Sequence, residues 1–96
     1  MEAVDRIEFA KFDWDENKRQ LSLAKSGVDF IDASMALLGP QAPSPHASEQ
    51  RIKAIANSNG RIVVVIFLVR DEATRIISAW PADKNEQREY RHVYGG

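Results

Sequence analysis

The sequence predicts an α+β fold, in which one antiparallel β-sheet is packed with two N-terminal helices and one C-terminal helix. Two observations support this prediction. A strand pattern, two helix patterns, three further strand patterns and a last helix pattern follow one another along the chain. In addition, Ile62–Val69 is an apolar run without alternation, which is typical of a central strand covered on both faces. At 96 residues, the chain is expected to form one domain over residues 1–96.

The first predicted elements are a strand and a helix. Residues 6–14 alternate polar and apolar side chains and predict a short, half-buried strand. The carboxylate of Asp13 or Asp15 is suited to cap the helix that follows, because it accepts hydrogen bonds from unpaired N–H groups of the first turn. We expect this helix to end at about Ser26, where Gly27 supplies a left-handed stop.

A second helix is predicted from about Asp29 to Gly39. Its apolar residues form a wide stripe that we expect to be buried. They are Phe30, Ile31, Ala33, Leu37 and Leu38. The next segment, residues 39–48, contains three prolines and therefore predicts a surface loop.

Three strands and a helix are predicted after this loop. The strands are expected at residues 51–56, 61–70 and 74–80. The Asn-Gly pair in the turn 57–60 is a hairpin signal, so this part is expected to be an antiparallel meander. Asp83 and Glu86 have the spacing of a capping box, which predicts a helix that ends at about Tyr94.

The composition excludes several classes of protein. No cysteine occurs, which rules out a disulfide scaffold, a thiolate zinc site, an iron–sulfur cluster and a cysteine nucleophile. The longest apolar run is far shorter than a membrane span and the acidic N-terminus lacks a signal-peptide core, so we expect a cytoplasmic protein with no membrane partner. His46 and His92 are far apart and lack carboxylates at ligand spacing, so no metal and no cofactor are expected. Each histidine is expected to be solvent-exposed, the alternative being that one of them shuttles protons.

The net charge of −1 conceals an asymmetry between the two halves of the chain. Residues 1–50 hold 5 Lys/Arg and 9 Asp/Glu, whereas residues 51–96 hold 8 Lys/Arg and 5 Asp/Glu. This basic excess indicates one face suited to phosphate. The alternative is that so small an excess has no functional meaning.

Five short motifs occur in order along nearly the whole chain. They are Phe12–Lys18, Lys25–Phe30, Gly60–Val65, Arg75–Ala79 and Glu86–Tyr90. Over about residues 9–94, this ordered set resembles the BrnT family, the toxins of type II toxin–antitoxin pairs. The resemblance implies a RelE-like fold and a metal-independent endoribonuclease activity on RNA that arrests translation. It also implies a BrnA-type antitoxin, whose ribbon-helix-helix domain binds DNA, in a heteromeric complex for which we expect two toxins and two antitoxins.

Two positions depart from the family's pattern. Ser26 stands where the family usually has histidine, and Trp80 stands where it usually has arginine. Metal-free cleavage needs a base for the 2′-hydroxyl, an acid for the leaving oxygen and cations for the charge on phosphate. Serine does not carry protons near neutral pH, and tryptophan has no charge. Two hypotheses follow: an endoribonuclease toxin with weak or rearranged chemistry, or an interaction protein that binds its antitoxin without cleaving RNA.

Three cationic side chains are the candidate catalytic residues. Arg51 lies in the family's Glu-x-Arg step and is suited to clamp phosphate, the alternative being a solvated strand end. Arg75 is expected beside Arg51 or Arg61, the alternative being an ion pair with an acidic residue of the turn at 71–72. Lys25 lies in the family's Lys-x-Gly step, the alternative being a solvated lysine favoured by the helix dipole.

Three further residues are candidates for substrate binding. Arg61 follows a turn glycine, and the alternative is a charge that only flanks the hairpin. Trp80 is suited to stack on a base at the mouth of a basic groove, although the simpler interpretation is that it fills the space of the family's arginine. Tyr90 matches the family's C-terminal tyrosine, and the alternative is a core residue.

Overall fold

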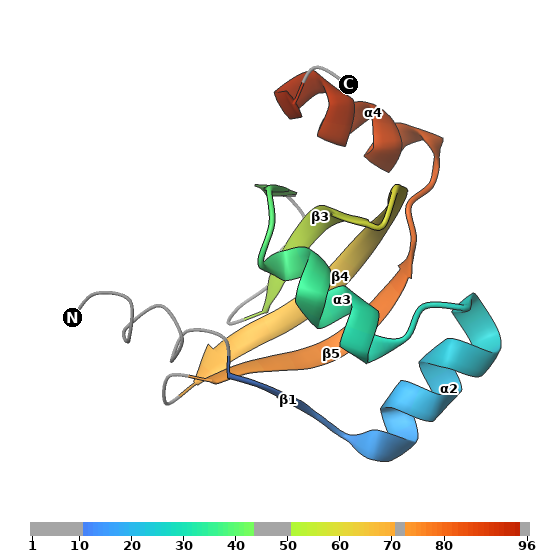
Figure 1. The fold of residues 1–96 in the computed structure, drawn as a ribbon, viewed down its shortest axis with the longest axis vertical. Coiled ribbons are helices and arrows are strands. Elements are labelled where there is room, and N and C mark those ends of the chain that lie inside the picture. Colours follow the sequence, from blue (N-terminus) through green and yellow to red (C-terminus); the bar gives the residue numbers. More distant parts are fainter. Residues whose placement is uncertain (1–10, 44–50, 71–72, 95–96) are drawn as a thin grey trace.

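The computed structural model describes residues 11–43, 51–70 and 73–94. Within these residues, a five-stranded sheet has the strand order β1-β5-β4-β3-β2 and is packed with three helices (Figure 1). The elements are β1 (Phe12–Trp14), α2 (Glu16–Ser26), α3 (Phe30–Leu37), β2 (Gln41–Pro43), β3 (Ile52–Ser58), β4 (Arg61–Arg70), β5 (Ala73–Pro81) and α4 (Lys84–Tyr94). The predicted α+β class and its arrangement of helices are confirmed.

The antiparallel meander predicted in the second half of the chain is also confirmed. Strand β4 lies in the middle of the sheet and pairs antiparallel with β3 on one side and with β5 on the other. The turn between β3 and β4 places Asn59 at φ 54° and Gly60 at φ 90°. Asparagine and glycine tolerate this left-handed backbone, which is why the Asn-Gly pair is a reliable hairpin signal.

The first strand differs from the prediction in its direction. β1 pairs parallel with β5, with Phe12 opposite Thr74, so the sheet is mixed and not purely antiparallel. A parallel pair requires a long connection, and here α2, α3 and the meander all lie between the two strands in the chain. Residues 6–10 of the predicted strand lie outside the described residues.

A short strand replaces part of the predicted loop at residues 39–48. β2 pairs antiparallel with β3, with Ala42 opposite Ile55, and forms the edge of the sheet away from β1. Its Pro43 has no backbone N–H to donate, and such a residue is tolerated in an edge strand. The prediction of a loop over 41–43 was therefore wrong; residues 44–48, including His46, lie outside the described residues.

The sheet separates two clusters of buried side chains. On one face, α3 packs against β3 and β5 through a cluster that includes Val63 and Val65. On the other face, α4 covers a smaller cluster that includes Val64 and Ile55. The centre of β4 is thus covered on both faces, as its apolar run predicts, but Val69 near its end is 60% exposed. In Figure 1, α3 crosses in front of the sheet and α4 lies beyond one end of the strands.

The apolar stripe predicted on the second helix is wider than the one that is buried. Phe30 and Ala33 are buried against the sheet, whereas Ile31 is 47% exposed and Leu38 is 56% exposed. The helix contacts the sheet along one line of residues three or four apart, so apolar side chains outside that line stay in solvent.

The helix ends follow the predicted chemistry. The side chain of Asp15, and not that of Asp13, caps α2 by accepting from the N–H groups of residues 17 and 18. Gly27 ends this helix at φ 75°. Asp83 and Glu86 form the predicted capping box at α4, each side chain accepting from the other residue's N–H at 2.8–2.9 Å.

Candidate functional site

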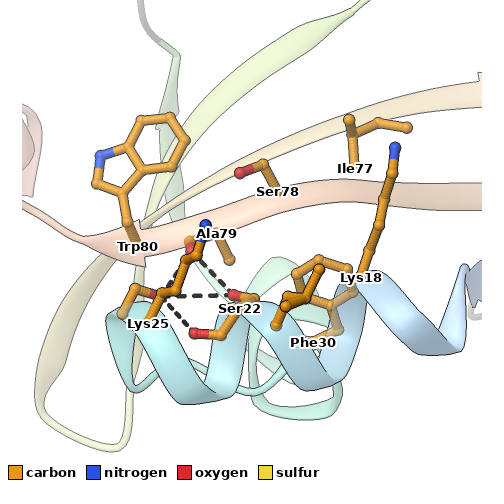
Figure 2. A pocket seen from close by; sticks show the side chains of 10 residues that line it. Lys18, Ser22, Lys25, Phe30, Ile77, Ser78, Ala79 and Trp80 are labelled. Carbon is orange, nitrogen blue, oxygen red and sulfur yellow. Dashed lines mark hydrogen bonds between the residues drawn. The ribbon is translucent and has the colours of Figure 1, made fainter.

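Helix α2 lies along strand β5, and a groove of about 310 Å³ runs between them (Figure 2). Ten described residues line it: Lys18, Leu21, Ser22, Lys25, Ser26, Phe30, Ile77, Ser78, Ala79 and Trp80. The two positions predicted to depart from the family's pattern, Ser26 and Trp80, both belong to this groove. They are 54 residues apart in sequence, and only the packing of α2 on β5 brings them together.

Two serines of α2 close the edge of β5. β1 pairs only with Thr74–Ile76, so no described strand lies beside β5 at Ala79 on this side. The hydroxyl groups of Ser22 and Ser26 lie 3.2 and 3.1 Å from the carbonyl oxygen of Ala79. Either hydroxyl can therefore donate to the Ala79 carbonyl oxygen, which lies on the side of β5 that has no described strand partner at this point. The side chain of Ser26 has a structural role at the position of the family's histidine.

The charges in the groove come from α2. Of the ten described lining residues, Lys18 and Lys25 are basic and none is acidic. They are seven residues apart on one helix, which separates them by about 10 Å along its axis and places both near the same face. Figure 2 shows the two side chains reaching from α2 toward β5. The sequence prediction included Lys25 but missed Lys18, although the helical spacing of the two lysines was visible in the sequence.

Trp80 joins the groove to the second core cluster. It pairs with Val64 across the ladder, packs against the cluster beneath α4 and is partly exposed. Its ring centroid lies 5.8 Å from the ammonium group of Lys53, within the range of a cation–π contact. Its packing against the core cluster agrees with the prediction that the indole fills space. Its place in the lining of the groove agrees with the alternative, in which the indole faces a basic groove.

Lys53 also forms an ion pair with Glu86 of α4, with Nζ 3.2 Å from Oε2. The two side chains are only 14% and 13% exposed. This pair connects β3 to the same glutamate that caps α4. Sequence analysis missed Lys53, the second residue of β3.

The charge asymmetry predicts a basic face, and the ladder shows which side chains share one face of the sheet. In the ladder, Leu68 is opposite Arg75, Ile66 is opposite both Lys53 and Ser78, and Val64 is opposite Trp80. Alternate residues of β4 point to the same face, so their partners share that face as well. The basic side chains placed on this face are thus Lys53 and Arg75, and each has an acidic partner, Glu86 and Asp13 respectively. The basic face therefore stays a prediction.

Of the two places predicted for Arg75, beside Arg51 or beside Arg61, the structure excludes the second. Its partner across the strands is Leu68, so it is not beside Arg61, which begins β4 at the opposite end. Its guanidinium forms an ion pair with Asp13 of β1 at 3.4 Å, and both side chains are partly exposed. The alternative ion pair with the acidic turn lies outside the described residues. Arg51 directly precedes Ile52, whose partner Phe67 is next to Leu68, so Arg51 and Arg75 flank β4 at the same end.

The remaining candidates have structural contacts. The guanidinium of Arg61 donates to the carbonyl oxygens of Gly27 and Ser26, at 3.2 and 3.4 Å, and so binds the C-terminal end of α2. Tyr90 packs against the second core cluster, with its ring centroid 4.9 Å from that of Tyr94.

The candidate residues thus form two groups. Lys25, Ser26 and Trp80 meet at the groove, whereas Arg51 and Arg75 lie at the other end of the sheet. Arg75 and Trp80 are five positions apart on β5, which corresponds to about 16 Å along the strand. The structure does not bring Lys25, Arg51 and Arg75 to one point.

Two other findings concern the described residues. They hold no group of three or more histidine, aspartate or glutamate side chains arranged to bind a metal ion. None of their helices has the length and apolar character needed to cross a membrane. His92 is exposed on α4, as expected.

The comparison with known proteins identifies the class as that of ribonuclease toxins. The family model described as the ribonuclease toxin BrnT of type II toxin–antitoxin systems matches residues 14–86. The chain therefore belongs to the BrnT family. It is similar to a crystal structure of the Brucella abortus ribonuclease toxin BrnT, with 38% sequence identity and a TM-score of 0.64. That match covers 77% of this chain and 97% of the other. No curated protein matches the chain.

Proposed function

We propose that this chain is a cytoplasmic, metal-independent endoribonuclease toxin that inhibits translation and acts as one RelE-like domain over residues 1–96. One observation carries the proposal beyond the family match: the two positions where the sequence departs from the family's pattern, Ser26 and Trp80, line one groove with Lys18 and Lys25. Residues that act on one phosphodiester must lie close together in space. We therefore assign the groove as the place where RNA is cleaved.

The groove and the sheet face have different parts in this proposal. Lys25 is the cation nearest the substituted positions and stabilises charge that develops on the scissile phosphate. Arg51 and Arg75 lie too far along the sheet to share that phosphate, so they contact neighbouring phosphates of the same strand. Such contacts provide affinity that falls with salt.

The chemistry of this groove is weaker than that of the family's pattern. No imidazole is present among its lining residues, and the hydroxyl of Ser26 is occupied by backbone oxygens. Proton transfer must then involve water or a group outside the groove. This specific observation favours slow cleavage, and it also supports the second candidate function, a toxin-like protein that binds its partner without cleaving RNA.

The two functions are separated by measuring growth and cleavage together. Expression without an antitoxin is expected to slow bacterial growth, and the purified protein is expected to cut a fluorogenic RNA slowly in the presence of EDTA. Normal growth together with no RNA cleavage at high enzyme concentration would support the non-catalytic protein. Cleavage that EDTA abolishes and added magnesium restores would contradict metal independence.

The proposed partner is a BrnA-type antitoxin with a ribbon-helix-helix domain, and DNA is bound only through it. The two arginines at one end of the sheet support this partner, because an acidic or amphipathic segment that covers Arg51 and Arg75 would also exclude RNA from that end. We expect two toxins and two antitoxins in the complex. Light scattering on the co-expressed pair tests this, and two species that elute separately at micromolar concentration would refute it.

A further inference from the structure

An indole, that of Trp80, lies at the groove where RNA is proposed to bind. The ring is partly exposed and lines the groove together with Lys25 and Ser78. Figure 2 shows the indole and the hydroxyl of Ser78 rising from β5 toward the same side, to which the Lys18 side chain also extends.

The indole is held in place from behind. Its packing against the second core cluster limits its rotation, and the ammonium of Lys53 lies 5.8 Å from the ring centroid. Lys53 is itself fixed by its ion pair with Glu86 at 3.2 Å. A ring that is already ordered loses little conformational entropy when a flat ligand binds to it.

The charges of the groove indicate a polyanion. Lys18 and Lys25 are the charged residues among its ten described lining residues, and they are spaced by about 10 Å along α2. An aromatic ring and cations along one groove are the combination that single-strand-binding proteins use, since bases stack on the ring and phosphates follow the positive charge.

We propose that Trp80 stacks on an unpaired base of single-stranded RNA whose flanking phosphates are bound by Lys18 and Lys25. This inference rests on the proposed function, because it places the substrate in the groove assigned to cleavage. It makes Trp80 a substrate-positioning and specificity-determining residue: the groove accepts a base that is free of pairing and rejects a duplex. In this proposal, Trp80 contributes binding of an RNA base at the position where the resemblance predicts an arginine that stabilises charge.

The chain contains two tryptophans, which makes a direct test possible. Trp14 belongs to the cluster beneath α2 and α3, on the face of the sheet away from Trp80. In Trp14→Phe, the emission therefore reports Trp80 alone. The probe is a six-nucleotide RNA with 2′-O-methyl groups, which cannot be cleaved through its 2′ oxygens. We expect it to quench the emission of Trp14→Phe, whereas Trp80→Phe, which retains Trp14 alone, shows no quenching.

Affinity for the same probe is then compared in Trp80→Phe and Trp80→Leu. Leucine keeps apolar bulk but has no π face, so we expect it to weaken binding by about 5- to 150-fold, the range for one base–aromatic stack. Phenylalanine is expected to remain within a few-fold of the wild type. A base-paired duplex of the same sequence should bind more weakly and quench less. Circular dichroism confirms that each variant is folded.

The two lysines are tested by the salt dependence of binding. Lys18→Ala and Lys25→Ala are each expected to reduce the slope of log K against log salt by about 0.7, the value for one phosphate contact on a single strand. Lys84→Ala, an exposed lysine of α4 that does not line the groove, is the matched control and should leave the slope unchanged.

The outcomes separate this inference from the proposed function. The stacking contact would be overturned if Trp80→Leu and Trp80→Phe bound the probe with equal affinity, or if the probe saturated Trp14→Phe without quenching its emission. RNA cleavage by the wild type would in that case still support the proposed function. If the wild type neither binds the probe nor cleaves RNA, the proposed function itself fails. Equal binding of the duplex and the single strand would contradict the preference for an unpaired base.

Discussion

The replacement of both substituted residues is the most informative perturbation of the groove. In the double variant Ser26→His, Trp80→Arg, an imidazole and a guanidinium enter a space of about 310 Å³ that already contains Lys25. General acid–base catalysis contributes about 10²–10⁴-fold, and one charge-stabilising donor about 10²–10³-fold. These factors do not multiply when the groups act in one step. We therefore expect the double variant to gain at least 10²-fold in kcat at saturating RNA, about the contribution of one group, while loss of the proposed Trp80 stack raises the KM.

The structure also sets the cost of this change. Loss of a fully buried tryptophan lowers the free energy of unfolding by about 3–5 kcal/mol. Trp80 is partly exposed, and the stem of the new arginine covers some of the same surface, so we expect a loss of about 1–3 kcal/mol. Trp80 is in an extended strand, which is the backbone that Pro81 requires of the residue before it. The double variant is therefore expected to fold, which thermal denaturation will check.

The assay is cleavage of a fluorogenic RNA, with growth after induction as a second readout. Ser22→His and Leu21→Arg are matched controls, because they introduce the same groups from other positions of the same groove. We expect little gain from the controls and a smaller gain from each single replacement than from the double one. Equal gains from the controls, no gain in a folded double variant, or fast cleavage by the wild type would each refute the assignment of this site.

Three further expectations concern the rest of the molecule. Arg51→Ala should raise the KM for RNA more than it lowers kcat and should reduce the salt dependence, since Arg51 lies at the end of the sheet away from the groove; steady-state kinetics at two salt concentrations measure this. Glu86→Gln removes the charge that pairs with the largely buried Lys53 and should destabilise the fold by about 1–3 kcal/mol, measured by urea unfolding, while an unchanged midpoint would contradict a stabilising pair. Hydrogen bonds from Arg19 and Gln20 lower the pKa of Glu16 to about 2 from its ordinary 4.5. The stability from this carboxylate is therefore complete above about pH 4.5 and is lost as the pH falls to about 2, so the stability difference between wild type and Arg19→Met should shrink over that interval.

Local chemistry explains why most elements could be predicted. The cap at Asp15, the left-handed Gly27 and the capping box of Asp83 and Glu86 depend on neighbours a few residues apart, and the structure shows each of them. The apolar run of β4 needs cover on both faces, which determines its central place whatever the topology. The order of elements, and with it the α+β class, follows from such short-range signals.

The candidate residues show where local reasoning ends. The sequence, through its resemblance to the family, singled out Ser26 and Trp80 as the positions predicted to depart from the family's pattern. Only the tertiary structure decided that both line one groove, that Arg61 binds the end of α2, and that Arg75 pairs with Asp13. It also decided that β1 runs parallel to β5 and that Lys53 supports the indole. These contacts join residues that are far apart in the sequence. Their geometry depends on how the helices pack on the sheet, and the periodicity of apolar residues along the chain does not predict that packing.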